Sequence, residues 1–152
     1  MPCAYCTSDD IRERVVEGNE LAIAFLTNIP IVPGHVLIIP TRCVTTVDAL
    51  TPEEAKAMEE MRRVACRALR ASCGAEGFNF AWNEGAVAGQ SVPHLHLHVV
   101  PRKRGDAGVY TYEPREFLYR PGSRVESPVE ELRAIRKKIR AHISPSSKPS
   151  AT

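Results

Sequence analysis

Short runs of apolar residues, several of them alternating with polar ones, predict a set of β-strands in this chain. These strand-like runs lie around residues 15–16, 21–26, 35–40, 78–83 and 94–100. Residues 21–26 scarcely alternate, which predicts a strand buried on both faces. Prolines and a glycine in the following turn make residues 35–40 its expected hairpin partner.

One long helix is expected between the third and fourth of these strands. Thr51 can cap its first turn, Pro52 suits the first helical position, and Glu54 completes a capping box. Gly74 is placed to end the helix. Its apolar face consists of Ala55, Met58, Met61, Ala65, Leu69 and Ser72. This face predicts a helix that covers one side of the sheet.

The last third of the chain has a different composition. Residues 103–127 are rich in Gly, Pro, Arg and Tyr, which predicts an irregular flap. A second helix is expected after Ser127 as its cap, with an apolar stripe of Val129, Leu132 and Ile135. Residues 144–152 are polar and contain proline, which predicts a disordered tail. The expected organisation is one domain, residues 1–143, followed by this tail.

Three histidines at alternate positions are the most unusual feature of the sequence. In a strand, His94, His96 and His98 would share one face, while Leu95, Leu97 and Val99 would enter the core. Pro101 is expected to end the pairing of this strand. The row of imidazoles is compatible with a structural role, with a nucleophilic site, or with a mononuclear zinc hydrolase.

A glycine-containing loop precedes the histidines and suggests an anion site. Its backbone N–H groups can converge on a phosphate, and Gln90 and Ser91 add side-chain donors. His35, at the start of another strand, is a candidate to support the histidine row.

Composition narrows the class of protein. Of the 152 residues, 43% are apolar and 25% are charged, which is ordinary for a globular domain, and a net charge of +2 predicts neither a nucleic-acid nor a membrane partner. No apolar stretch is long enough for a membrane span and no signal-peptide pattern is visible, so a cytoplasmic location is expected. The five cysteines, including the pair Cys3 and Cys6, then indicate thiols, a redox pair or metal ligands.

The segment His94–Val100 resembles the His-φ-His-φ-His-φ-φ signature of the histidine triad superfamily, where φ is an apolar residue. The likeness extends to residues 33–40, 83–85 and 89–91, and it covers roughly residues 3 to 104. Residues 32–40 and 101–103 are most similar to the fragile histidine triad branch of dinucleoside polyphosphate hydrolases. The pair Cys3 and Cys6 instead resembles bacterial members that carry a structural zinc.

The resemblance implies an α+β fold, in which a five-stranded antiparallel sheet with a long helix and a C-terminal helix pairs into a homodimer. It also implies a purine nucleotide substrate and an enzyme that acts at the α-phosphate through a nucleotidyl-histidine intermediate. His96 matches the nucleophile, a role that a neutral imidazole nitrogen can fill at neutral pH. His98 and His35 match positions that contact phosphate or hold the triad in place.

The same resemblance implies the remaining substrate contacts. Asn83, Gly89 and Ser91 match phosphate-binding positions, with Gln90 beside them. Phe25 and Leu26 match the wall of the base pocket. The family's ribose-contacting acid or amide falls on Thr27, so either Thr27 or the adjacent Asn28 is expected to meet the sugar.

Zinc-bearing relatives use two cysteines, the first triad histidine and a further histidine, whose place is taken here by Cys43. The resemblance therefore implies a closed zinc site made of Cys3, Cys6, Cys43 and His94, with no catalytic metal required.

Dinucleoside polyphosphates are the first expectation for the substrate. The alternatives are a nucleoside phosphoramidase, or a nucleotide-binding signalling protein with vestigial hydrolysis.

Overall fold

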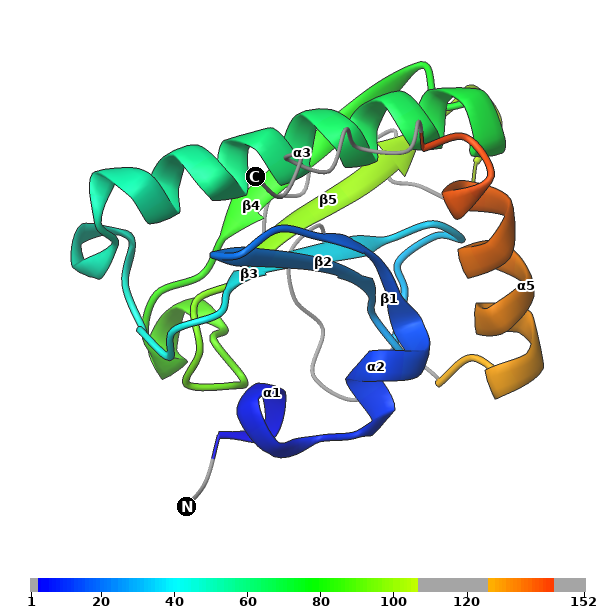
Figure 1. Ribbon diagram of the computed structural model, residues 1–152. Helices are drawn as coiled ribbons and strands as arrows, with labels where there is room; N and C mark the ends of the chain where they lie inside the picture. Colours follow the sequence, from blue (N-terminus) through cyan, green and yellow to red (C-terminus); the bar gives the residue numbers. More distant parts are fainter. Residues whose placement is uncertain (1–2, 107–125, 144–152) are drawn as a thin grey trace, which may run out of the picture.

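A computed structural model describes residues 3–106 and 126–143 of the chain (Figure 1). Residues 107–125 of the expected flap and the whole of the expected tail, residues 144–152, lie outside these described residues. The elements are, in order, α1 (Ala4–Thr7), α2 (Asp10–Arg14), β1 (Val15–Gly18), β2 (Ala22–Leu26), β3 (Val36–Pro40), α3 (Pro52–Cys73), β4 (Gly77–Trp82), β5 (Leu97–Arg102) and α5 (Val129–Arg140), with short 3-10 turns at Val47–Ala49 and Ala86–Ala88. Among the described residues, no helix is both long and apolar enough to span a bilayer.

The five strands form one antiparallel sheet in the order β1-β2-β3-β5-β4, which confirms the expected α+β class. Helix α3 lies across one face of this sheet, and α1 and α2 lie toward the other (Figure 1). Strand β2 is buried on both faces, as its apolar run predicts: Ala22, Ala24 and Leu26 join the core beneath α3, whereas Phe25 joins a second cluster on the opposite face. The sheet therefore has one face covered by α3 and a second face with its own smaller apolar cluster, to which α1 and α2 contribute Tyr5 and Ile11.

The signals at both ends of α3 act as predicted. The Thr51 hydroxyl accepts a hydrogen bond from the Glu54 backbone N–H, and the Glu54 carboxylate accepts one from the Thr51 backbone N–H. Gly74 ends the helix in the left-handed conformation. The apolar face is rotated from the expected one, because Ala55 is exposed and Glu54 is buried. Glu54 is buried because it makes an ion pair with Arg42, a partner that helical spacing cannot reveal.

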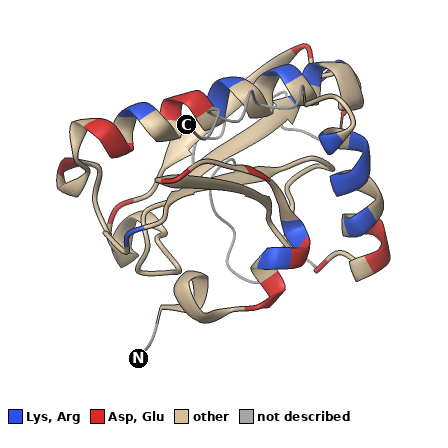
Figure 2. Ribbon diagram, viewed as in Figure 1, with Lys and Arg blue, Asp and Glu red and all other residues tan. Residues whose placement is uncertain are grey.

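Helix α5 closes one edge of the sheet. Arg136 Nε donates to the Val15 carbonyl at 2.6 Å, and Arg140 Nη1 donates to the Val16 carbonyl at 3.0 Å. Figure 2 shows the basic residues of α5 beside β1. Two of these basic residues, Arg136 and Arg140, therefore satisfy carbonyls of an edge strand.

The start of α5 differs from the prediction. Pro128, and not Ser127, occupies the cap position. The Ser127 backbone N–H instead donates a hydrogen bond to the Asn28 carbonyl at 2.9 Å. Val129 is exposed, whereas Leu132 and Ile139 are buried and Ile135 is partly buried. The stripe that packs on the core therefore begins one turn later than expected.

Strand β5 begins at Leu97, so His94 and His96 lie before the strand and not within it. Pro101 does not end the pairing, because it is opposite Phe78 and Arg102 is opposite Gly77 in the ladder with β4. The proline is tolerated there because the ladder with β3 has already ended at Val99.

The turn before His35 packs tightly against the end of α3. Gly34 has φ of +90°, and a Cβ at this position would lie 3.1 Å from Leu69 Cδ2 and 3.2 Å from Cys73 Sγ. Only glycine combines this backbone conformation with so close an approach. Gly34 therefore fixes the entry into β3, and with it the position of His35.

Candidate active site and metal centre

A short hydrogen bond to a backbone carbonyl fixes the tautomer of His96. Its Nδ1 lies 2.8 Å from the carbonyl oxygen of His94, and the residue is buried. A carbonyl can only accept, so Nδ1 carries the proton of the neutral ring and Nε2 carries the lone pair. The structure therefore presents an unprotonated nitrogen, which is what a nucleophile requires.

Two successive hydrogen bonds through His35 fix the tautomer of His98. The Ile31 backbone N–H donates to His35 Nδ1 at 3.1 Å, so His35 carries its proton on Nε2. That nitrogen lies 3.0 Å from His98 Nδ1 and donates to it. His98 consequently carries its proton on Nε2, as a donor suited to a phosphate oxygen. His35, buried with no exposed surface, thus supports the row of histidines as expected.

His96 and His98 share the sheet face opposite α3. Leu97 and Val99 enter the core beneath the helix, as the alternation predicts, and the rings of His96 and His98 lie 5.0 Å apart. Phe25 belongs to the apolar cluster on this same face, opposite α3. Leu26 points instead into the core beneath α3, which corrects its assignment to a base pocket on the histidine face.

The glycine-containing loop is folded on itself. The backbone N–H groups of Ala88, Gly89 and Gln90 donate to carbonyls of Gly85 or Ala86 within the loop. They do not converge outward as an anion cradle, because the 3-10 turn uses them. Gly89 permits this turn with a φ of +93°.

Gln90 braces the loop and does not extend from it. Its side-chain oxygen accepts from the Gly85 N–H at 2.8 Å, and its Nε2 donates to the Thr45 carbonyl at 3.0 Å. Ser91 is exposed at the end of the loop. Asn83 is buried directly after the Trp82–Leu97 pair of the ladder, a position that the register brings opposite His96. The ladder register therefore brings Asn83 opposite His96, whereas the Ser91 side chain is exposed to solvent.

Both residues that were expected to meet the ribose, Thr27 and Asn28, make side-chain hydrogen bonds within the protein. Thr27 is buried, and its hydroxyl accepts from the Ile29 N–H at 3.3 Å. Asn28 donates from its side chain to Glu126 Oε1 at 3.1 Å. The Asn28 amide is thus engaged with the segment that leads into α5.

Four candidate metal ligands come together beside the triad, as the resemblance implies. One ligand atom from each of Cys3, Cys6, Cys43 and His94 lies within 4.8 Å of all the others. The Cys3 and Cys6 sulfurs lie 3.3 and 3.5 Å from His94 Nδ1. His94 Nε2 donates to the Pro40 carbonyl at 2.8 Å, which leaves the lone pair on Nδ1, facing the sulfurs. Burial lowers the pKa of His94 and keeps it neutral, as a metal ligand must be.

The Cys6 thiolate is opposed by the neighbouring Cys3 and Cys43 thiolates. Burial and the neighbouring Cys3 and Cys43 thiols raise the pKa of Cys6 to about 12. A divalent cation would relieve this repulsion, because it binds thiolates and not thiols. The donor set therefore fits a metal ion, and its sulfur-rich composition fits zinc or another thiophilic ion.

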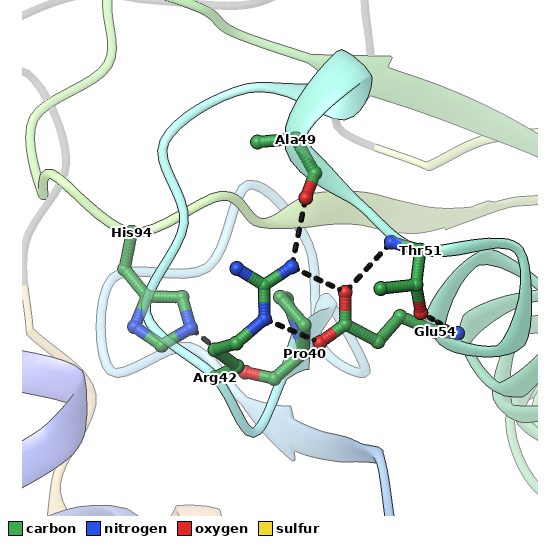
Figure 3. A network of polar contacts seen from close by, with 6 residues as sticks. All are labelled: Pro40, Arg42, Ala49, Thr51, Glu54 and His94. Atoms are coloured by element: carbon green, nitrogen blue, oxygen red, sulfur yellow. Dashed lines mark hydrogen bonds and ion pairs between the residues drawn. The ribbon is translucent and has the colours of Figure 1, made fainter.

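A polar network holds the loop that carries Cys43 (Figure 3). Arg42 binds both carboxylate oxygens of Glu54 at 2.8 and 2.7 Å, and it also donates to the Ala49 carbonyl. The hydrogen bonds from Arg42 and from the Thr51 backbone hold the pKa of Glu54 at about 2, so the clamp persists well into acid. Together with the bond from His94 to Pro40, this clamp ties the metal-ligand cluster to the first turn of α3.

The mononuclear metal alternative does not fit this geometry. In residues 3–106 and 126–143, the three triad histidines do not form a metal-binding group; only His94 does, and it does so with cysteines. His96 and His98 direct their Nδ1 atoms to a carbonyl and to His35, respectively.

Sequence reasoning alone missed Tyr5 and Arg42. Tyr5 lies within the cysteine pair, where an aromatic side chain could have been noticed, and its ring contacts those of Phe25 and His96. Arg42 has no local signal, because its partner Glu54 is twelve residues away.

The chain is similar to known proteins of one family. The model of the HIT domain matches residues 8–105. The chain is 35% identical over 102 residues to a bis(5'-nucleosyl)-tetraphosphatase of Schizosaccharomyces pombe, covering 67% of this chain but only 56% of that protein. It is 32% identical over 120 residues to a bis(5'-adenosyl)-triphosphatase of Dictyostelium discoideum, covering 76% of this chain and 80% of that protein.

A solved structure is similar over nearly the whole chain. It is that of a zinc-bound histidine triad family protein from Mycobacterium smegmatis, which aligns with a TM-score of 0.66 at 28% identity over 91% of this chain and 94% of that one. Given the domain match, these relatives and the alternating histidines at positions 94, 96 and 98, the chain belongs to the HIT domain family, that of the histidine triad proteins.

Proposed function

We propose that this protein is a hydrolase of dinucleoside polyphosphates that transfers a nucleoside monophosphate to His96 and then to water. The observation that carries the proposal is the hydrogen bond from His96 Nδ1 to the His94 carbonyl, which places the lone pair on Nε2. The relatives from Schizosaccharomyces pombe and Dictyostelium discoideum, named as a tetraphosphatase and a triphosphatase of dinucleosides, support this substrate class.

The reaction divides into two displacements at phosphorus. In the first, His96 Nε2 attacks the α-phosphorus, a P–N bond forms, and the P–O bond to the leaving nucleotide breaks. His98 donates from Nε2 to a phosphate oxygen and offsets the charge that develops there. In the second, water attacks the same phosphorus, the P–N bond breaks, and the nucleoside monophosphate is released. Two lower barriers replace one high barrier.

The proposed substrate contacts follow from the described geometry. Phe25 is buried in the apolar cluster on the histidine face, where it would back the base pocket. Asn83 and Ser91 donate to phosphate oxygens, while Gly89 and Gln90 shape the loop that carries Ser91. Thr27 and Asn28 lie at the end of β2, where the sugar would follow the base.

We assign zinc to the cluster of Cys3, Cys6, Cys43 and His94. When bound, zinc supplies a closed crosslink between the N-terminus, the loop after β3 and the start of the triad. No reaction step passes through it, because His96 offers its own nitrogen.

A panel of substrates tests the assignment. We expect diadenosine polyphosphates to be hydrolysed with a nucleoside monophosphate as one product, and with a higher kcat/KM than adenosine 5'-phosphoramidates. A reversed preference would make the protein a nucleoside phosphoramidase. Nucleotide binding without turnover of either class would favour a signalling role.

A homodimer is proposed through the β4 edge of the sheet. Arginines of α5 satisfy carbonyls of the β1 edge, whereas Phe80 and Trp82 on β4 leave 44% and 38% of their surface exposed. The guanidinium of Arg62, on α3, lies over the Phe80 ring at 5.1 Å from its centroid. The exposed aromatic residues of β4 and the adjacent side of α3 therefore form one surface. Exposed aromatics on an edge strand are typical of an interface.

We expect Trp82→Lys to convert a dimer into a monomer, because the lysine introduces a charge into the buried centre of the interface. Light scattering coupled to size-exclusion chromatography measures the mass. Val87→Lys, on the fully exposed turn before the histidines, is the matched control and is expected to remain dimeric. A monomeric wild-type protein at micromolar concentration would refute this proposal.

A further inference from the structure

Tyr5 connects the metal-ligand cluster to the proposed nucleophile. It lies between Cys3 and Cys6 in α1, and its ring meets that of His96 edge to face, with centroids 5.6 Å apart and planes at 87°. It meets the Phe25 ring in the same manner, at 5.4 Å and 72°. The same side chain thus contacts the ring that is proposed to attack phosphorus and the apolar cluster beside it.

The position of Tyr5 depends on the cluster that surrounds it. Helix α1 is a single turn of four residues, and its N-cap residue makes no side-chain hydrogen bond to it. One isolated turn is not stable in water, because nucleation costs more than its few hydrogen bonds return. What holds it is tertiary contact: the sulfurs of Cys3 and Cys6 meet His94, and the Tyr5 ring meets the sheet.

The hydrogen bond from Nδ1 to the His94 carbonyl sets the tautomer of His96. The aim of Nε2 also depends on the groups that pack against the ring and limit its swing about that bond. The ring contacts with Tyr5 and with His98, at 5.6 and 5.0 Å, restrict that swing. Reaction at phosphorus is sensitive to such aim, because the attacking atom must approach in line with the leaving group.

We infer that Tyr5 is a positioning residue for His96, and that zinc in the adjoining cluster governs the rate of nucleotidyl transfer by holding Tyr5 in place. The inference rests on the proposed function of His96. It gives the metal an effect on rate without a part in the chemistry. Ring contacts join Tyr5 to His96 and Phe25, and phenylalanine would keep both of them.

Tyr5→Ala is expected to lower kcat by about two- to tenfold, the effect of losing an edge-to-face aromatic contact, with zinc content unchanged. Tyr5→Phe is expected to retain the wild-type kcat. A residue that only forms a wall for the base would instead raise KM and leave kcat unchanged.

The decisive comparison combines the substitution with metal removal. Stripping zinc with a chelator, or removing a ligand by Cys6→Ser, is expected to lower kcat of the wild type by the same factor as Tyr5→Ala. In Tyr5→Ala itself, zinc removal is expected to have no further effect, because the two changes act through one contact. Additive losses would overturn the inference.

A readout independent of turnover keeps the inference separate from the proposed function. In protein labelled with ¹³C-histidine, the ring resonances of His96 are expected to shift or broaden when zinc is removed and in Tyr5→Ala, and to be restored in Tyr5→Phe. Unchanged His96 resonances in Tyr5→Ala would refute the coupling, even if the protein is a hydrolase. Wild-type protein that never turns over a nucleotide would refute the proposed function, whatever the resonances show.

Discussion

Replacing His96 by glycine is expected to lower the turnover of diadenosine polyphosphates by several orders of magnitude, on the order of 10³-fold or more. The reason is that the substitution removes the only nitrogen proposed to form a bond with phosphorus. The fold is expected to persist, because the backbone around residue 96 is held by other contacts, among them the bond of 2.6 Å from the Leu95 N–H to the Val44 carbonyl. Nucleotide binding should also persist, since Phe25, Asn83 and Ser91 remain.

The measurement is kcat with diadenosine polyphosphate for the wild type and the variant, together with nucleotide affinity by calorimetry. His142 offers a matched control. It is an exposed histidine two residues after the end of α5, and its Nδ1 is hydrogen-bonded to the Lys138 carbonyl. His142→Gly is expected to retain wild-type turnover. A His96→Gly variant that keeps normal turnover would rule out the proposed nucleophile.

Replacing Cys43 by alanine is expected to abolish stoichiometric zinc binding. Three ligands remain, but the closed tetrahedral set is broken. The loss of affinity should exceed the roughly 10- to 100-fold that the loss of an outer hydrogen bond causes, because a direct bond to the metal is removed. The apparent stability should fall as well, since a metal that binds only the folded state stabilises it.

Zinc content is measured by mass spectrometry of the dialysed, reduced protein, and affinity is measured by competition with a chromophoric chelator. Cys73→Ser is the control, because Cys73 lies at the end of α3, outside the cluster. That variant should bind zinc as the wild type does. Wild-type protein without zinc under reducing conditions, or a Cys43→Ala variant with unchanged affinity, would contradict the assignment.

The parts of the fold that depend on local signals could be predicted from the sequence. The capping box at Thr51 and the glycine at position 74 define α3, and the turn before β3 defines the hairpin. These signals act over a few residues, so no tertiary information is needed. The five-stranded antiparallel sheet and the metal ligands Cys3, Cys6, Cys43 and His94 were expected from the resemblance to a family, since residue spacing alone could not have brought residues 3 and 94 together. The order of the strands was not predicted, because it depends on pairing between distant segments.

The errors share a physical cause, because each depends on a partner distant in sequence. His94 leaves the expected strand because its ring is drawn between the cysteines and the Pro40 carbonyl. Gln90 turns inward because the Thr45 carbonyl accepts its amide. Glu54 is buried because of Arg42. The local sequence pattern predicts which positions face solvent or the core. It does not predict which distant group will form a hydrogen bond or ion pair with a polar side chain.

The central claim is that His96 becomes covalently bound to a nucleoside monophosphate during turnover. Intact mass spectrometry of the protein, quenched early in the reaction with diadenosine polyphosphate, tests it most directly. We predict an added mass equal to one adenylyl group, located on the peptide that contains His96 and absent from His96→Gly. Rapid turnover with no adduct in the wild type, or an adduct that persists in His96→Gly, would contradict this account.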